Sequence, residues 1–146
     1  MRKQYRGTVI LETRRGILVN ATRNGKFILP GGRTSFQEGR LQAAVRELRE
    51  ETGLRAFAAI ELFCHEAPPH ATRGFQDFHK VFYVRAPGEP VPMSEVKLVA
   101  FVGVGQTEVD GRPVSPVSVE IIRRYAEMRR AAPLLFEALD NFTPLG

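Results

Sequence analysis

One segment, running from Gly32 to Leu54 with the sequence GRTSFQEGRLQAAVRELREETGL, most constrains how this chain can fold. Its second half places apolar residues at steps of three and four, the spacing of one face of an α-helix. The members of this stripe are Leu41, Ala44, Val45 and Leu48. The spacing predicts a helix that packs the stripe on a hydrophobic core and ends at Gly53, since glycine suits a helix C-terminus.

Three glutamates form a second face of the same predicted helix. Glu47, Glu50 and Glu51 stand at positions i, i+3 and i+4, so their carboxylates converge. Like charges at this spacing cost roughly 0.2–0.5 kcal/mol per pair, and acidic groups near a helix C-terminus cost roughly 0.3–1 kcal/mol each. Arg46 and Arg49 offset part of this cost, whereas a hard divalent cation bound by several carboxylate oxygens offsets more. A solvated acidic face is the alternative, but it does not explain the glycines that flank the helix.

The full pattern extends beyond the helix on both sides. It consists of Gly32, five residues, Glu38, seven residues, and then Arg46-Glu47-Leu48-x-Glu50-Glu51-x-Gly53-Leu54. At these positions the chain resembles the Nudix hydrolase family, whose signature box it matches throughout. The resemblance implies an α/β fold, namely an α/β/α sandwich with a mixed central sheet. It also implies hydrolysis of a pyrophosphate bond in a nucleoside diphosphate linked to another moiety, with Mg²⁺ or Mn²⁺ as the cofactor.

The resemblance also assigns roles to single residues. The metal ligands that it implies are the carbonyl of Gly31 and the carboxylates of Glu47, Glu50 and Glu51. Arg46 corresponds to the arginine that orients the glutamates, Glu47 to the general base proposed for some members, and Glu38 to an auxiliary acidic residue. Many members have Ser or Thr just before the helix, where this chain has Gly39. Glycine lacks a side-chain acceptor for the first helical turn, which predicts a less rigid loop.

Two residues outside the box are further candidates for the site. Glu95 precedes a predicted strand, and family members often take the base or an extra metal ligand from such a loop; a solvated loop charge is the alternative. His79 shares a strand face with Asp77 and either borders a substrate-binding cleft or is a hydrogen-bonded sheet histidine. Pro69 follows Leu54 by fifteen residues, a spacing associated in the family with ADP-ribose hydrolysis, although a hairpin loop also explains it. The predicted catalytic residues are therefore Arg46, Glu47, Glu50 and Glu95.

Alternating apolar and polar residues, separated by turn residues, predict strands on both sides of this helix. The predicted strands cover residues 5–12, 16–22, 26–29, 55–66, 75–85 and 96–104, and a second helix covers residues 117–130. Segment 67–74 contains two prolines and is predicted to be a loop. Pro133 either ends the second helix or begins a short last one that runs to Asp140. Because no repeat or linker interrupts the pattern, we expect one domain over residues 1–146.

The composition agrees with a folded domain and narrows its surroundings. Hydrophobic residues make up 43% of the chain and charged residues 25%, which is ordinary for a soluble globular protein. The one cysteine, Cys64, cannot form an internal disulfide, and its place in a predicted strand favours a small apolar filler. No apolar run reaches the length of a signal peptide or a membrane span. We therefore expect a cytoplasmic protein with no membrane contact.

The net charge of +5 favours an anionic partner. Basic pairs are scattered along the sequence, at residues 14–15, 123–124 and 129–130, so a dedicated nucleic-acid surface is not indicated. A positive field would still steer a small-molecule nucleotide towards the glutamates. Two alternatives stay open, an RNA 5′-end pyrophosphohydrolase and a Nudix-fold sensor that binds a nucleotide without turning it over. The sequence leaves a homodimer open as well.

Overall fold

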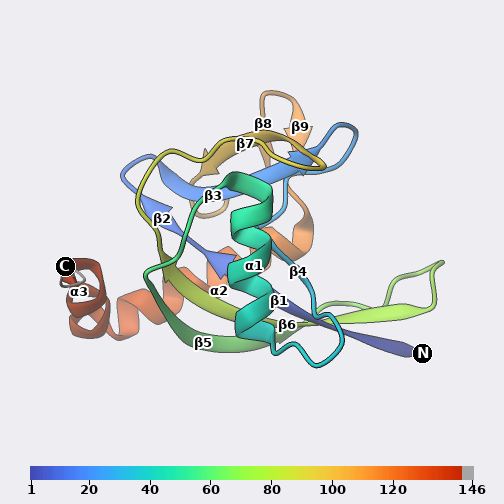
Figure 1. The fold of residues 1–146 in the computed structure, drawn as a ribbon, viewed down its shortest axis with the longest axis horizontal. Coiled ribbons are helices and arrows are strands. Elements are labelled where there is room, and N and C mark those ends of the chain that lie inside the picture. The colour runs from blue at the N-terminus through green and yellow to red at the C-terminus, as the bar shows by residue number, and fades with distance from the viewer. Residues whose placement is uncertain (143–146) are drawn as a thin grey trace.

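Two β-sheets lie between helices α1 and α2, and a short helix α3 follows (Figure 1). The computed structural model describes residues 1–142. The helices are α1 (Arg40–Thr52), α2 (Pro116–Ala131) and α3 (Pro133–Asn141). The strands are β1 (Arg2–Ile10), β2 (Glu12–Thr13), β3 (Gly16–Thr22), β4 (Gly31–Arg33), β5 (Ala58–Glu66), β6 (Phe75–Arg85), β7 (Val96–Val102), β8 (Glu108–Val109) and β9 (Arg112–Pro113).

The larger sheet is mixed, as predicted. Its strand order is β4-β1-β6-β5, with a parallel pair β1 and β6 at the centre and antiparallel pairs on either side. The smaller sheet has the order β2-β3-β7 and is antiparallel. A separate hairpin joins β8 and β9.

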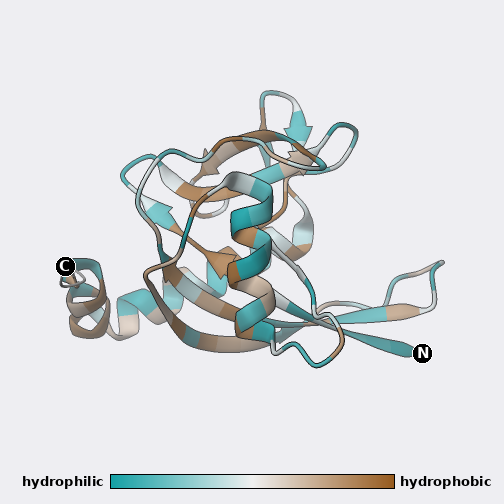
Figure 2. Cartoon of the chain, in the orientation of Figure 1, coloured by the Kyte–Doolittle hydropathy of each residue, from teal (hydrophilic) through white to brown (hydrophobic). Residues whose placement is uncertain are grey.

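Each face of the central strand pair packs on a different helix, because successive side chains of a strand point to opposite faces. On one face, Val9 of β1 and Phe82 of β6 pack in a cluster with Leu48 of α1. On the other face lies a second cluster, which joins β1, β3 and β6 to α2 and α3 through Ile10, Ile17, Val81, Tyr83, Ile121, Tyr125 and Phe136. The predicted α/β/α sandwich is therefore confirmed, and Figure 2 shows hydrophobic residues concentrated on its inner strands.

Helix α1 meets the sheet through a stripe that differs from the predicted one. Ala44 and Leu48 are fully buried, as predicted, but Leu41 is 44% exposed, so its assignment to the core was wrong. The sheet comes closest to α1 at Gly7, where an added Cβ would lie 1.9 Å from the carbonyl oxygen of Arg40. This close backbone approach buries the side of α1 that carries Ala44 and leaves Leu41 outside, on a surface groove. The helix ends at Gly53 in the left-handed conformation, as predicted.

The segment before the box does not form the predicted strand at residues 26–29. Ile28 exchanges backbone hydrogen bonds with Asn20, whereas Phe27 turns the other way and bonds to residues 113 and 115. A segment that changes partner at each residue makes isolated bridges rather than a ladder. The chain forms a strand just after this segment, where β4 pairs antiparallel with β1 over residues for which no strand was predicted.

The other long strands and the second helix lie within a few residues of their predicted bounds, whereas the two-residue strands β2, β8 and β9 were not predicted as separate strands. Strand β6 coincides with its prediction, while β1 begins earlier, at Arg2, and β5 later, at Ala58. Helix α2 is capped by the Ser115 side chain, which accepts a hydrogen bond from the backbone of Ser118, and α3 begins at Pro133. Within residues 1–142 we find no helix that is long and apolar enough to cross a membrane.

Candidate functional site

The glutamates of α1 face a pocket of about 300 Å³ at one end of the smaller sheet. The pocket is closed by the C-terminal part of α1, by β3 with the turn that follows it, and by the start of β7. Its charged and amide side chains are Asn20, Lys26, Glu47, Glu50, Glu51 and Glu95. The structure therefore brings together the three box glutamates and Glu95, which is distant in sequence.

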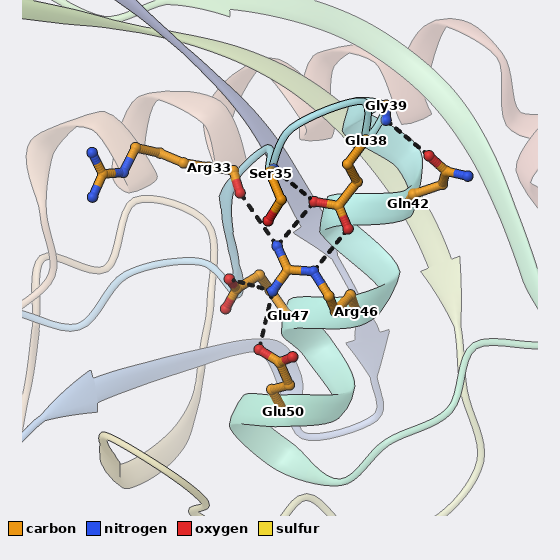
Figure 3. Close-up of polar contacts among 8 residues, drawn as sticks. All are labelled: Arg33, Ser35, Glu38, Gly39, Gln42, Arg46, Glu47 and Glu50. Atoms are coloured by element: carbon orange, nitrogen blue, oxygen red, sulfur yellow. Dashed lines mark hydrogen bonds and ion pairs between the residues drawn. The ribbon is translucent and has the colours of Figure 1, made fainter.

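Arg46 organises one side of this pocket (Figure 3). Its guanidinium donates to both carboxylate oxygens of Glu38, at 2.8 and 3.0 Å. The same group donates to Glu47 at 3.0 Å and to Glu50 at 3.1 Å, and its remaining N–H reaches the carbonyl oxygen of Arg33 at 3.3 Å. One guanidinium thus positions three carboxylates and fixes the loop between β4 and α1.

Glu38 holds this loop in place through its hydrogen bonds. Its carboxylate accepts a 3.0 Å hydrogen bond from the backbone of Ser35 in addition to those from Arg46. The hydrogen bond from Arg46, followed by that from Ser35, lowers the pKa of Glu38 to about 2. At the helix start, the Gln42 side chain accepts a 2.8 Å hydrogen bond from the backbone of Gly39. These contacts hold the loop where the N-cap glycine supplies no side chain.

Glu51 is the most deeply placed acidic group of the site. Its carboxylate accepts a 3.0 Å hydrogen bond from the N–H of Gly31. Burial, aided by repulsion from Glu47, raises its pKa to about 7, although the Gly31 hydrogen bond opposes the shift. A Cβ at Gly32 would lie 2.7 Å from the carboxyl carbon of Glu47. Any larger residue at this position would therefore clash with the Glu47 carboxylate. The role of the Gly31 carbonyl as a metal ligand stays a prediction.

Asn20 is a site residue that the sequence analysis missed. Asn20 is 1% exposed and lines the pocket beside Glu51. Its side chain opposes the rise in the pKa of Glu51. Among residues 1–142 its amide nitrogen has no hydrogen-bond partner of good geometry. The available signal was one polar residue within the apolar run Ile17–Ala21. Lys26, on the same pocket, followed a turn and carried no signal of its own.

Glu95 reaches the pocket because its loop is fastened to the end of α1. The backbone N–H of Val91 donates to the carbonyl oxygen of Thr52, and that of Met93 donates to the carbonyl oxygen of Glu51, both at 3.0 Å. Glu95 itself is exposed. The position is compatible with either a base or a solvated charge at the pocket rim, and its catalytic role stays a prediction.

His79 lies apart from the glutamates, in a neighbouring cavity of about 240 Å³. Its Nδ1 is 2.7 Å from the hydroxyl oxygen of Thr8, and the cavity is shared with Arg6 and Gly31. Burial, together with the positive charge of Arg6, lowers the pKa of His79 to about 3, so the imidazole is neutral near pH 7. His79 is therefore hydrogen-bonded within the sheet and also lines a cavity, and its part in substrate binding stays a prediction.

The glutamates are not gathered around one point. Among the described residues no group of three or more His, Cys, Asp or Glu side chains is close enough to hold a metal ion. Two of the carboxylates turn towards Arg46, and Glu51 turns towards the backbone of β4. The donor set nevertheless suits a hard divalent cation, because it consists of carboxylate oxygens that repel one another inside one pocket. A cation at this site would compete with the Arg46 guanidinium for the carboxylates of Glu47 and Glu50.

Comparison with known proteins places this site in a family. The family model of the NUDIX domain matches residues 1–125. A Nudix hydrolase family member from Chromobacterium violaceum is 36% identical, with a TM-score of 0.77 over 93% of this chain and 87% of that one. This chain belongs to the Nudix family. The family prediction is confirmed, and the protein is an enzyme of the pyrophosphohydrolase class.

More distant Nudix structures share the fold. A MutT Nudix hydrolase from Burkholderia pseudomallei is 18% identical with a TM-score of 0.72, over 85% of this chain and 98% of that one. An ADP-ribose pyrophosphatase from Streptococcus suis is 15% identical with a TM-score of 0.59, over 84% and 91% of the two chains. No curated protein sequence matches the chain. These two likenesses concern the fold alone.

Proposed function

We propose that this Nudix protein is a metal-dependent hydrolase that cleaves a pyrophosphate bond in a nucleoside diphosphate linked to another moiety. The observation that carries the proposal is the crowding of Glu47, Glu50 and Glu51 in one pocket, where Arg46 pairs with only the first two. A fold gains nothing from holding like charges together. A site that binds Mg²⁺ or Mn²⁺ between these carboxylates and a polyphosphate does need them.

The cation fits the residues that are present. Glu51, the Gly31 carbonyl and the two glutamates that Arg46 holds would bind it, because all belong to the same end of α1 and β4. When bound, Mg²⁺ or Mn²⁺ supplies positive charge to the pyrophosphate and an acidified water for attack at phosphorus. The products are a nucleoside monophosphate and either pyrophosphate or a phosphorylated moiety.

The chain's own groups perform three tasks in this reaction. Arg46 keeps Glu47 and Glu50 on the pocket side of α1, and Glu38 fixes Arg46 in turn. Glu47 or Glu95 accepts the proton of the attacking water, since both carboxylates line the pocket. Lys26 also lines the pocket and supplies a positive charge for a phosphate oxygen.

The cavity around His79 supplies a binding region for the rest of the substrate. It adjoins the acidic pocket across β4, because Gly31 lines this cavity while its N–H bonds to Glu51. Its walls offer donors and acceptors from Thr8, Asp77 and Ser118 beside apolar side chains. A nucleoside needs both kinds of surface. His79 is thus proposed as a substrate-binding residue rather than a metal ligand.

A hydrolysis screen tests this function. Purified protein is incubated with nucleoside triphosphates, dinucleoside polyphosphates, ADP-ribose, nucleotide sugars and capped RNA, with Mg²⁺, with Mn²⁺, or with excess chelator. We expect a nucleoside monophosphate from at least one substrate in either metal and none in chelator. Full turnover in chelator would contradict the metal mechanism. Nucleotide binding without turnover of any substrate would indicate a sensor instead.

A further inference from the structure

Asn20 of β3 and Glu51 of α1 lie at the end of an otherwise apolar contact between strand and helix. Two residues before Asn20, on the same face of β3, Leu18 packs in a cluster with Leu48 of α1. Glu51 follows Leu48 by three residues and so lies on the same side of the helix. An amide and a carboxylate, which both line the acidic pocket, therefore take the place of a further apolar pair.

The backbone of Asn20 has its own partners, so the side chain is not needed to complete the sheet. The N–H of Asn20 donates to the carbonyl oxygen of Ile28 at 2.9 Å, and the N–H of Ile28 donates back at 2.8 Å. On the other side of β3, Val99 of β7 lies opposite Asn20. A strand that is paired on both sides fixes the backbone of Asn20 and leaves its buried side chain little room to turn.

The side-chain amide of Asn20 is a cost to the fold. Within residues 1–142, its nitrogen is the only buried side-chain nitrogen or oxygen atom that has no hydrogen-bond partner of good geometry. A buried donor without a partner destabilises a folded chain, because it has given up its hydrogen bonds to water. A β-branched apolar residue would suit this position in a strand better. The presence of an amide here points to a task in the pocket.

The group that the amide faces is the carboxylate of Glu51. The side chain of Asn20 acts on Glu51 as a hydrogen-bond donor, because it opposes the rise in the pKa of that carboxyl. The N–H of Gly31 in β4 donates to Oε1 of the same carboxylate at 3.0 Å. Glu51 therefore has one well-aligned donor from the larger sheet and a less well-aligned donor from the smaller sheet.

The amide nitrogen cannot contact a ligand itself, because the atom is buried. Its effect on the pocket must pass through Glu51. Carboxylates that bind metal ions are themselves held by hydrogen bonds, and loss of such a partner weakens metal binding. Hydrogen bonds that serve a site are often poorly aligned in the free protein and tighten in the complex. A donor from each sheet would fix the plane of the Glu51 carboxylate.

We propose that Asn20 is a positioning residue that orients the carboxylate of Glu51 for cation binding. Its amide donates to Glu51 from the smaller sheet, in addition to the N–H of Gly31 from the larger sheet, and this hydrogen bond tightens when a divalent cation is bound. The inference rests on the proposed function, because it takes Glu51 to be a ligand of the cation. Strand β3 then helps to hold the cation site through Asn20, which is not itself a ligand.

Mn²⁺ affinity without substrate, followed by electron paramagnetic resonance, tests this role with three variants. Asn20→Val removes the amide, and Asn20→Thr has nearly the shape of valine but keeps a hydroxyl donor. Tyr125→Phe is the control, because it removes a polar group from an equally buried residue away from the pocket. We expect Asn20→Val to bind Mn²⁺ about tenfold more weakly than wild type, Asn20→Thr to recover part of this loss, and the control to bind as wild type does.

Thermal unfolding in chelator separates positioning from a structural role. Asn20→Val should unfold at the wild-type temperature or higher, because a buried donor without a partner is gone. Wild-type Mn²⁺ affinity in Asn20→Val would overturn the proposal. Equal losses of affinity in Asn20→Val and Asn20→Thr, together with a lower unfolding temperature, would also overturn it, since the shape of the residue rather than its donor would then matter.

A double-mutant cycle shows whether Asn20 acts through Glu51. In a Glu51→Gln protein, Asn20→Val should change Mn²⁺ affinity by less than about twofold, because the carboxylate that it positions is already gone. An undiminished loss in that background would contradict the proposal. At saturating Mg²⁺, Asn20→Val should also leave KM for the substrate within about twofold of wild type, whereas a direct contact with the substrate would raise KM.

The same measurements separate this inference from the function on which it rests. If wild type binds Mn²⁺ and hydrolyses a nucleotide, but Asn20→Val has the same Mn²⁺ affinity, the inference fails and the proposed function stands. If wild type binds no Mn²⁺, the proposed function fails and the inference fails with it.

Discussion

The acidic pocket and the polar network around Arg129 differ in how many partners each of their carboxylates has. In the network, Tyr125 donates to Glu12 at 2.6 Å, and Arg129 donates to the Tyr125 hydroxyl at 2.8 Å. Arg129 also pairs with Asp140, which accepts a hydrogen bond from Tyr83. Each of the two carboxylates therefore has a hydroxyl donor and lies near one guanidinium. This balance fastens α3 and the end of α2 to the sheet.

In the acidic pocket the balance is missing. Arg46 pairs with Glu38, Glu47 and Glu50. Glu51 pairs with no guanidinium, and the Gly31 N–H, Asn20 and the charge of Arg6 only partly offset its burial and the repulsion of Glu47. The network around Arg129 stabilises the fold without a ligand, whereas we expect added positive charge to stabilise the pocket further. The contrast teaches that burial of charge alone does not mark a site. The two regions differ in the ratio of carboxylates to guanidinium groups: two carboxylates lie beside Arg129, whereas three pair with Arg46 and Glu51 lies next to these.

The largest expected effect follows from removing the deepest charge of the pocket. We expect Glu51→Gln to lower turnover by at least about 10²-fold, because it removes a ligand of the cation that stabilises the transition state. In chelator the same variant should unfold at the same temperature as wild type or slightly higher, since a repelled buried charge is gone. Steady-state kinetics and thermal unfolding measure the two effects. Near wild-type turnover would show that Glu51 is not a ligand.

The next effect decides between two candidate bases on the pocket wall. General-base catalysis contributes about 10²–10⁴-fold, so loss of the base should lower kcat by that order with substrate binding retained. We expect Glu47→Gln to cause this loss and to remove the acidic limb of the pH–rate profile. Glu95→Gln should change kcat by less than a few-fold, because the side chain is exposed at the rim. The opposite result would place the base outside the box.

A smaller effect, on stability alone, is expected from the balanced network. Arg129→Met leaves Asp140 and the Tyr125 hydroxyl without their guanidinium partner, at a cost of about 1–2 kcal/mol once the partial exposure of the pair is allowed for. Denaturant unfolding should show this loss, while kcat stays within a few-fold of wild type. Arg130→Met is the matched control, since that neighbour is exposed. A large loss of activity in Arg129→Met would show that the network also supports the site.

An effect of similar size, which appears only at low pH, concerns His79 in the cavity beside the acidic pocket. Its pKa falls from 6.5 in the unfolded chain to about 3 in the folded one, so between these values the unfolded chain binds more protons. Stability is therefore complete above about pH 6.5 and is lost as the pH falls, by about 1–2 kcal/mol at pH 5. His79→Asn, which can keep a hydrogen bond to Thr8, should flatten this decline in denaturant unfolding between pH 7 and 5. His70→Asn, in an exposed loop, should leave this decline unchanged. An unchanged decline in His79→Asn would contradict the assignment.

Local patterns predicted the helix and its glutamates, whereas the partners of those residues depended on long-range register. Glu47, Glu50 and Glu51 lie a few residues apart, so helical geometry alone placed them on one face. Asn20 joins them only because the turn after β3 brings β3 beside the end of α1. Leu41 fitted the helical stripe equally well, but the close approach of the sheet at Gly7 decided which side of the helix was buried.

The same limit applies to the surfaces. Arg2 and Arg33 are distant in sequence, and only the pairing of β1 with β4 places them on one face. The predicted strand at residues 26–29 failed for a related reason, because its apolar residues were read as a ladder although each bonds to a different partner. Periodicity identifies which residues are apolar or charged on an element. It does not identify the neighbour that each one meets.

Equilibrium Mn²⁺ binding, followed by electron paramagnetic resonance in the absence of substrate, tests the central claim most directly. Three proteins are compared: wild type, Glu51→Gln from the acidic pocket, and Glu12→Gln from the network around Arg129, so that one negative charge is removed from each region. We expect wild type and Glu12→Gln to bind Mn²⁺ with the same affinity, and Glu51→Gln to bind it about tenfold or more weakly. Equal Mn²⁺ affinity in all three proteins would contradict it.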